Sequence, residues 1–289
     1  MRHGAKELAV TADDLGLSPG VNRGIAEAHR SGIVTSASIM PNMPAFDEAA
    51  TLCATNPRLS VGVHITLTCG RPLRDPSRIP TLTDATGHFY TPRAFLARLL
   101  VGRIDISEAA TECEAQIQAV INRNIRPMHI NSHHHIHLHP PLMQAFREVA
   151  QQCGISHIRY GRPDLGGLFR GDGFDCSSLG AWRGLARMLV ASFSRLCVLG
   201  PEDDADRERT LLGLPYYKAG DYVRSLVRWI ERCPEGLSEL VCHPGCADDA
   251  ATDLDGCAEM RAEELRALTS QAAWDAVRRS GVELIPFLK

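Results

Sequence analysis

The sequence predicts an α/β protein, a closed or nearly closed (β/α) barrel of seven or eight strands. Short apolar runs alternate with amphipathic segments along most of the chain. Proline and glycine stand at the starts and ends of several amphipathic segments. Polar residues repeatedly end the apolar runs, and in such barrels the active site lies at the carboxyl ends of the strands. Barrels of 289 residues are common as one unit, so we expect a single domain over residues 1–289.

The first elements show this alternation clearly. Residues 7–12 form an apolar run that is typical of a buried strand. Ser18 and Pro19 then occupy the N-cap and the first position of a predicted helix, and Gly32 follows its end. A second strand is expected at about residues 33–40.

The same pattern continues to the C-terminus. We expect a helix starting at Pro44, a strand at 60–66, two helices ending by Asn124, a strand at 128–133, a helix at 140–154, a strand at 156–160, a helix at 222–233, a strand at 238–245, two charged helices and a last strand at 282–287. Residues 161–210 are predicted to form an insertion that shapes a substrate pocket, with a solvated loop as the alternative.

Composition limits the class of partner. The net charge of -3 shows no excess of positive charge of the kind that binds nucleic acid. No apolar stretch is long enough for a transmembrane segment, and no signal region is visible, so we expect a cytoplasmic protein with a small-molecule partner. Homo-oligomers are compatible with this composition. The ten cysteines, which include no Cys-x-x-Cys pair, are expected to be reduced thiols.

Half of the twelve histidines lie in the segment HINSHHHIHLHP, residues 129–140. Imidazoles are costly to bury without a partner, and they are the commonest metal ligands. If the segment is extended, His133 and His135 point to one side and His134 to the other. We expect His133 to bind a metal, and His135 and His137 to line the pocket or to support the ligands.

Other polar residues end predicted strands: Asp13 and Asp14, His64, and His243. One Asp with two His provides three metal ligands and leaves a position for water, as in hydrolytic sites. A second carboxylate can then serve as a base, and a further histidine as an acid.

Each of these signals has a simpler interpretation. The aspartates favour a turn before a helix, His64 alone is typical of a hydrogen-bonded core histidine, and His243 stands at a strand exit. Cys242 and Cys246 flank His243 and could indicate a soft metal site, but a structural zinc site normally has four ligands.

Several segments resemble the YdjC-like carbohydrate deacetylases, in order and over nearly the whole chain. They are TADDLGLSPGVNRGI, GIVTSASIMPNMPAFDEAA, VGVHITLTCGRPL, NSHHHIHLHP and CHPG. The resemblance implies a NodB-like distorted (β/α) barrel that removes acetyl groups from N-acetylated amino sugars with a divalent metal ion.

The same resemblance assigns roles to individual residues. It places the metal ligands at Asp14, His64 and His133, the catalytic base at Asp13 and the general acid at His243. The ligand types favour Zn²⁺ without excluding Mg²⁺, and Ni²⁺ or Co²⁺ would also fit.

Two positions depart from the usual family pattern. Asn131 stands where the family has Asp, and an amide cannot raise the basicity of a neighbouring imidazole as a carboxylate does. Leu15 stands where Phe is more frequent. Asn131 and the HLHP that follows the histidines are similar to the branch associated with hopanoid biosynthesis, whose members act on an amino-sugar lipid head group.

Two other functions fit part of the pattern. One is a metal-dependent hydrolase of another amide or ester, although amidohydrolase barrels usually carry His-x-His on the first strand, where this chain has Asp13 and Asp14. The other is an inactive metal-binding or sugar-binding protein, which has no need of a spare base and acid.

Overall fold

The computed structural model describes residues 4–160, 162–163, 209–213, 222–246 and 257–287. Its strands are β1 (Lys6–Leu15), β2 (Ser36–Ile39), β3 (Ser60–Ile65), β4 (Ile130–Ser132), β5 (Arg162–Pro163), β6 (Thr210–Leu212), β7 (Gly236–Cys242) and β8 (Val282–Leu284). Most of the predicted insertion at 161–210 lies outside the described residues, so that prediction stays a prediction.

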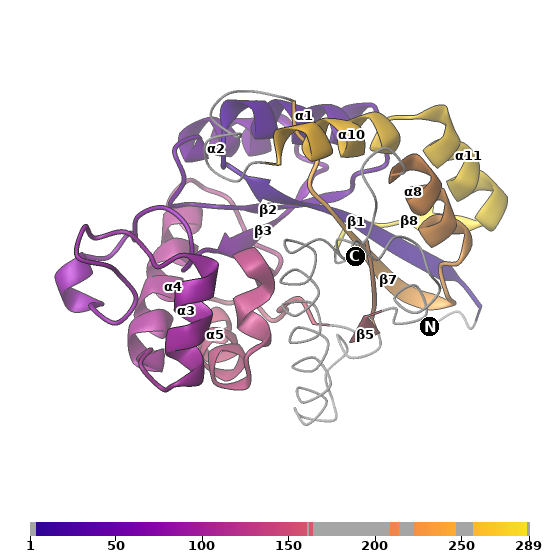
Figure 1. The fold of residues 1–289 in the computed structure, drawn as a ribbon. Coiled ribbons are helices and arrows are strands. Elements are labelled where there is room, and N and C mark those ends of the chain that lie inside the picture. Colours follow the sequence, from indigo (N-terminus) through magenta and orange to yellow (C-terminus); the bar gives the residue numbers. More distant parts are fainter. Residues whose placement is uncertain (1–3, 161, 164–208, 214–221, 247–256, 288–289) are drawn as a thin grey trace.

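The strands form one parallel sheet in the order β4-β3-β2-β1-β7-β6-β5, and β8 pairs with the start of β1. A further parallel bridge joins Ile130 of β4 to Ile158, in the segment that leads to β5. Because β4 and β5 are the two ends of the strand order, this bridge curls the sheet into a distorted barrel (Figure 1). The predicted fold class is therefore confirmed.

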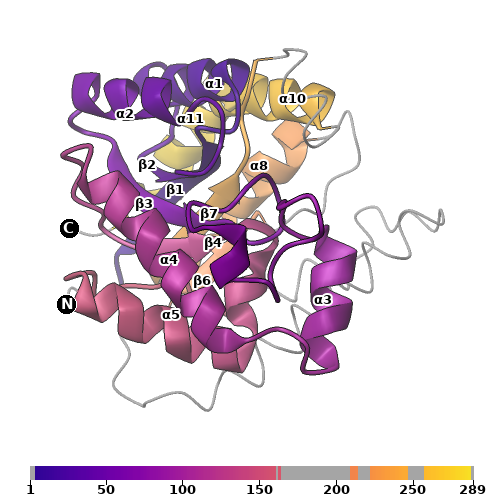
Figure 2. The ribbon, with the colours of Figure 1, turned by 90° about the vertical axis from the view of Figure 1, so that its left-hand side faces the viewer.

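The helices are α1 (Pro19–Arg30), α2 (Phe46–Thr55), α3 (Pro92–Leu100), α4 (Ile106–Ile121), α5 (Pro140–Gln152), α8 (Tyr222–Glu231), α10 (Ala258–Leu268) and α11 (Gln271–Ser280), with short 3-10 turns η1 (Pro76–Arg78) and η2 (His133–Leu138). Figures 1 and 2 show α1, α2, α10 and α11 along one side of the sheet, and α4 and α5 together on another. None of the helices in these described segments combines the length and apolar character needed to cross a membrane.

Helix boundaries follow the predicted chemistry closely. The Ser18 side chain accepts a hydrogen bond from the backbone N–H of Val21, and Pro19 opens α1. At the end of α5, Gly154 has a φ of 78°, a left-handed conformation that favours glycine. The prediction at Pro44 was less accurate, because α2 begins at Phe46.

The predicted strand at 156–160 was only partly right. Only Ile158 forms a bridge there, and the neighbouring ladder with β6 begins at Arg162. The backbone N–H of Ile130 donates to His157 O, and its carbonyl accepts from the N–H of Arg159. These two hydrogen bonds satisfy backbone groups of the segment without a regular strand ladder.

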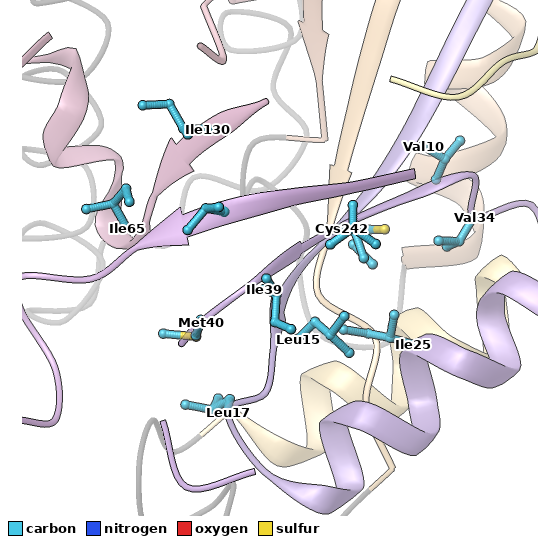
Figure 3. Close-up of a cluster of buried hydrophobic side chains, with 14 of the residues drawn as sticks. Val10, Leu15, Leu17, Ile25, Val34, Ile39, Met40, Ile65, Ile130 and Cys242 are labelled. Atoms are coloured by element: carbon cyan, nitrogen blue, oxygen red, sulfur yellow. The ribbon is translucent and has the colours of Figure 1, made fainter. Parts of the chain in front are cut away.

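The core fills the space between the sheet and the helices. Figure 3 shows side chains of this core from several strands, including Val10, Ile39, Ile65 and Ile130, together with Ile25 of α1. All of them are completely buried. This burial holds the strands in register, so their carboxyl ends present a fixed set of polar residues.

Candidate metal centre

A bulge near the end of β1 brings two consecutive carboxylates to the same place. Ala12 pairs with Ala37 and Leu15 with Ile39, so β1 contains one residue more than β2 between these pairs. Asp14, within the bulge, has a φ of 70°, a conformation that aspartate tolerates better than most residues. Regular strands alternate their side chains between faces. Here both Asp13 and Asp14 are buried, and they contact residues from beyond β2: Asp13 contacts Asn131 of β4, and Asp14 contacts His64 of β3.

Asp14 lies between two histidines. Its Oδ1 is 3.2 Å from His64 Nε2 and 3.0 Å from His133 Nδ1. Within the described part of the chain, these three residues form the group whose ligand atoms all lie within 4.8 Å of one another. One carboxylate oxygen and two imidazole nitrogens suit Zn²⁺ and other late divalent metals, so the donor set fits a metal ion.

The second oxygen of Asp14 is held by a residue from the C-terminal half. Arg261 of α10 donates a hydrogen bond to Asp14 Oδ2 over 2.6 Å. Burial alone would raise the pKa of Asp14, but the charges of Arg261 and His133 hold it well below its ordinary value. Asp14 therefore stays ionised with Oδ1 facing the histidines.

Asp13 is bound by a buried arginine. Arg159 donates hydrogen bonds to both oxygens of Asp13, one of them over 2.9 Å, and its Nε donates to Glu239 Oε1 over 2.9 Å. All three side chains are almost completely buried. Burial opposes the charge of Asp13, yet Arg159 and His64 lower its pKa far below the usual range. Asp13 is thus a charged, oriented carboxylate.

Asn131 connects Asp13 with His64, which lies beside Asp14. Its Oδ1 lies 2.7 Å from His64 Nδ1, and its Nδ2 donates to Asp13 Oδ1 over 3.0 Å. A third contact joins Nδ2 to Ser38 Oγ over 2.9 Å. The amide therefore supports the His64 ring at Nδ1, the nitrogen that faces away from Asp14. Unlike a carboxylate, it adds no second negative charge beside Asp13.

His243 follows β7 and is partly exposed. Its backbone N–H donates to Glu264 Oε2, and its Nδ1 lies 3.9 Å from Glu264 Oε1. Burial lowers the pKa of His243, but the hydrogen bond and charge of Glu264 outweigh it and raise the pKa above the ordinary value.

The loop after His243 packs tightly against α1. Gly245 donates its N–H to Arg261 O, and Cys246 donates to Gly20 O. A Cβ added to Gly24 would lie 2.4 Å from the Cα of Gly245. These close contacts with the backbone of α1 therefore hold the loop after His243 in position.

The histidine segment is not extended, and the expectation drawn from an extended chain was wrong. After Ser132 the chain enters η2, where His134 and His135 have φ values of 56° and 54°. Strand alternation therefore does not apply beyond His133. His134 is exposed and its Nδ1 lies 2.9 Å from Thr68 Oγ1.

His135 and His137 have different surroundings. Burial lowers the pKa of the half-buried His135 to about 3. His137 is fully buried, with Nδ1 2.6 Å from Ser132 Oγ and Nε2 3.0 Å from Arg159 O. Its ring therefore supports the chain around Arg159 and does not contact the three clustered metal-ligand candidates.

Sequence reasoning missed Arg159, Glu239, Arg261 and Glu264. Two of them carried a signal, because Arg159 and Glu239 are charges inside apolar runs that were predicted as strands. Arg261 and Glu264 lie in a helix rich in charge, where no sequence pattern distinguishes buried charged residues from solvent-exposed ones. As for the suggested soft metal site, Cys242 is buried and its thiol lies 3.5 Å from the carbonyl of Thr11.

Comparison with known proteins agrees with this architecture. Residues 7–279 match the family model described as YdjC-like protein. A carbohydrate deacetylase of Geobacillus stearothermophilus is 32% identical, with 96% of this chain and 95% of the relative covered. A carbohydrate deacetylase of Brevibacillus brevis is 30% identical over 97% of this chain and 98% of the relative.

A solved structure also matches over the full length. It comes from Enterococcus faecalis V583 and is named for cellobiose-phosphate cleavage; the TM-score is 0.74 at 26% identity, with 98% of each chain covered. The match to the family model spans far more than half of the sequence. The chain therefore belongs to the YdjC-like protein family.

Proposed function

We propose that the protein is a metal-dependent carbohydrate deacetylase, which removes the acetyl group from an N-acetylated amino sugar or its conjugate. The observation that carries this proposal is the convergence of Asp14, His64 and His133 beside a second buried carboxylate, Asp13. A binding protein would not need that second carboxylate. The carbohydrate deacetylases that cover nearly the whole chain support the same reaction.

In this proposal Asp14, His64 and His133 would hold one divalent ion, Zn²⁺ or Mg²⁺ with Ni²⁺ and Co²⁺ as alternatives. Such an ion, when bound, makes a water molecule more acidic and polarises a carbonyl group. Arg261 donates to the other oxygen of Asp14, which leaves Oδ1 beside the two histidines as the oxygen that would hold the ion.

Asp13 acts as the base. Arg159 and Asn131 keep it charged and oriented, but its lowered pKa also makes it a weak base. Asp13 can therefore accept a proton only from a donor that is itself acidic. Water adds to the carbonyl carbon of the acetamide as this proton leaves.

His243 acts as the general acid. The C–N bond then breaks, and the departing amine takes a proton from His243, giving acetate and a free amino sugar. The hydrogen bond and charge of Glu264 raise the pKa of His243, which increases its protonated fraction near neutral pH. His135 and Asn131 complete the proposed pocket, and His137 supports it from behind.

The substrate is best sought among conjugates as well as free sugars. The sequence resemblance of Asn131 and HLHP to the hopanoid-associated branch supports a lipid-linked amino sugar. We propose one catalytic domain over residues 1–289, in which the segment at about 161–210 contributes to substrate binding.

The test is acetate release by metal-stripped protein reconstituted with Zn²⁺, Mg²⁺, Ni²⁺ or Co²⁺. The substrates are N-acetylglucosamine, its nucleoside diphosphate form, chitobiose and an N-acetylglucosaminyl lipid. Metal-dependent acetate from one of these is the expected result. Binding of one metal ion per chain without acetate from any substrate would instead favour another acyl substrate or a binding protein.

Variants separate the roles. Asp14→Ala and His133→Ala should lose metal binding and turnover together, whereas Asp13→Asn and His243→Gln should keep the metal and lose turnover. His88→Ala, on an exposed loop, is the matched control and should change neither. Retained turnover in Asp14→Ala or Asp13→Asn would refute the assigned roles.

A further inference from the structure

The loop that follows β3, residues 66–74, is held by side chains of one helix, and we call it the β3 loop. It begins directly after the strand that carries His64. Helix α4 packs on β3 (Figure 2) and provides three polar side chains, Glu108, Glu112 and Gln116, at intervals of four residues. Residues at this spacing lie on the same face of a helix. These side chains therefore form one stripe along α4.

Gln116 satisfies the backbone of the first residue of the β3 loop. Its Oε1 accepts a hydrogen bond from the N–H of Thr66 over 2.9 Å, and its Nε2 donates to the carbonyl of Thr66 over 2.8 Å. Both residues are fully buried. A helix side chain thus takes the place that a neighbouring strand would have at this position. The pairing fixes the direction in which the chain leaves β3.

Glu112 holds the far end of the β3 loop. Its Oε1 accepts from the N–H of Leu73 and its Oε2 from the N–H of Arg74, each over 2.9 Å. Gln116 Nε2 also donates to Oε1 over 2.8 Å. Burial of the Glu112 side chain raises its pKa, and these hydrogen bonds oppose the rise. Because a carboxylate can only accept, Glu112 matches a place where several N–H groups converge.

The β3 loop runs along the rim of the metal centre. Thr68 Oγ1 lies 2.9 Å from His134 Nδ1, and the ring centroids of His134 and His133 are 3.9 Å apart. On the other side of the loop, Asn42, which follows β2, donates from Nδ2 to two carbonyls of the loop, each over 3.1 Å. The loop therefore lies between the end of β2 and η2, beside the metal-ligand candidates.

The direction of α4 places the β3 loop beyond the edge of the sheet. β3 and β4 are parallel neighbours, so α4, in the connection between them, runs in the opposite direction. Residues before Gln116 in this helix therefore lie progressively beyond the carboxyl ends of the strands. Glu112 is about 6 Å further out along the helix axis than Gln116. The β3 loop thus rises above the sheet on one side of the metal centre.

We propose that the β3 loop is a wall of the substrate pocket, and that Glu112 and Gln116 are positioning residues that hold this wall against a bound N-acetylated sugar. The acetamide group must reach the metal centre, so the sugar that carries it must lie against the rim. Residues 69–74 of the loop are partly or fully exposed there. This inference rests on the proposed function and adds residues that determine the affinity for its substrate.

The first measurement is hydrogen–deuterium exchange of backbone amides in the metal-free protein, followed by NMR. Glu112→Gln keeps the shape of the side chain, but its amide turns N–H groups toward at least one backbone N–H that the carboxylate accepted. We expect faster exchange at Leu73 and Arg74. Gln116→Met removes the partner of Thr66, where exchange should also become faster.

Glu108→Gln is the matched control. Glu108 lies about one turn before Glu112 on the same face of α4, and its Oε2 accepts from the N–H of Thr81 over 2.8 Å. The substitution is chemically the same, but Thr81 lies outside the β3 loop. Exchange in this variant should become faster at Thr81 and stay unchanged at Leu73 and Arg74.

The second measurement is the kinetics of acetate release by Zn²⁺-loaded protein. A hydrogen bond to a charged group is worth about a factor of ten or more in an equilibrium constant. When the binding position of the loop becomes less populated, the apparent affinity falls in proportion, so KM should rise about tenfold in Glu112→Gln. Zn²⁺ affinity and kcat should stay within about twofold of the wild type, and so should KM in Glu108→Gln.

Several outcomes would overturn the inference. One is unchanged exchange at Leu73 and Arg74 in Glu112→Gln, and another is faster exchange there with a wild-type KM. An equal rise of KM in Glu108→Gln would show a general loosening around α4. Loss of Zn²⁺ affinity would show that these residues support the metal centre instead of a pocket wall. If Glu112→Gln does not fold, Gln116→Met is judged by the same criteria.

Failure of the proposed function would give a different result, because the wild type would then release no acetate from any substrate. Calorimetric titration of the Zn²⁺-loaded protein with chitobiose would take the place of KM. Weaker binding by Glu112→Gln than by Glu108→Gln would still support the wall. Absence of chitobiose binding by the wild type would overturn the inference as well.

Discussion

Arg159 binds both oxygens of Asp13 inside the barrel, where neither side chain is more than 1% exposed. The same guanidinium also contacts Glu239, so one cation is shared by two buried carboxylates. A buried charge without its partner is strongly destabilising. The arginine is therefore a structural requirement for keeping a charged Asp13 in the barrel interior.

Arg159→Met should destabilise the protein by about 3–5 kcal/mol, because it leaves two carboxylates without their buried cation. Urea denaturation followed by circular dichroism measures this change. Arg279→Met is the control, since Arg279 pairs with Glu231 at the surface and its loss should cost about 0–1 kcal/mol. Similar losses in both variants would contradict the special role of the buried cluster.

Glu264→Gln should move the alkaline limb of the deacetylase pH profile to lower pH. A general acid works in its protonated form, so activity falls as pH rises through the pKa of His243. Glu264 raises that pKa, and the neutral amide removes its charge while keeping the shape. The measurement is kcat against pH, with Glu263→Gln, at the adjacent position of α10, as the control. An unchanged alkaline limb would show that His243 is not the group that titrates.

Gly24→Ala should reduce turnover even though alanine favours a helix by about 1 kcal/mol over glycine. The new methyl group would meet the backbone of Gly245 and displace either α1 or the loop that carries His243. Turnover and melting temperature are compared with those of Arg23→Ala, at an exposed position of the same helix. Wild-type turnover in Gly24→Ala would mean that this close contact does not position His243.

Metal-free protein should lose stability as the pH falls from 7 to 5. Burial lowers the pKa of His129 and His137 well below the ordinary value, and that of His135 to about 3. Below about pH 6.5 the unfolded chain takes up protons that these folded residues do not, so unfolding becomes more favourable. The slope is at most about 1.4 kcal/mol per pH unit for each histidine.

The two site aspartates should not contribute to that slope. Their folded pKa values are depressed, so their stabilisation is present above the unfolded value of about 3.9 and is lost only as pH falls through the folded values. Urea denaturation at several pH values tests this, and His129→Phe should flatten the curve. A free energy of unfolding that stays constant from pH 7 to 5 would disagree with neutral buried histidines.

Local patterns were sufficient for most elements and for the candidate site. Alternating strand and helix signals predicted the barrel, and Ser18 and Pro19 marked the start of α1. The same reasoning collected Asp13, Asp14, His64, His133 and His243 at one rim, because the carboxyl ends of parallel strands meet at one edge of a sheet. The family resemblance then assigned Asp14, His64 and His133 as the metal ligands, and these three lie together in the structure. Their convergence follows from strand direction, which the order of elements along the chain already contains.

Other features depended on contacts between residues far apart in sequence. Whether Asp13 and Asp14 both face the site depends on a bulge opposite β2, and a regular strand would have separated them. The turn after His133 places its neighbours away from the positions that an extended chain would give.

The sequence by itself determined the order of elements, the strand-end histidines and carboxylates, and the family resemblance, because these depend on short-range periodicity and on residue type. Only the tertiary structure decided which charges bind those carboxylates and how their hydrogen bonds are directed. Arg159 meets Asp13 across 146 positions, and Arg261 meets Asp14 across 247. Such pairings are set by the packing of the whole barrel, which no local pattern encodes.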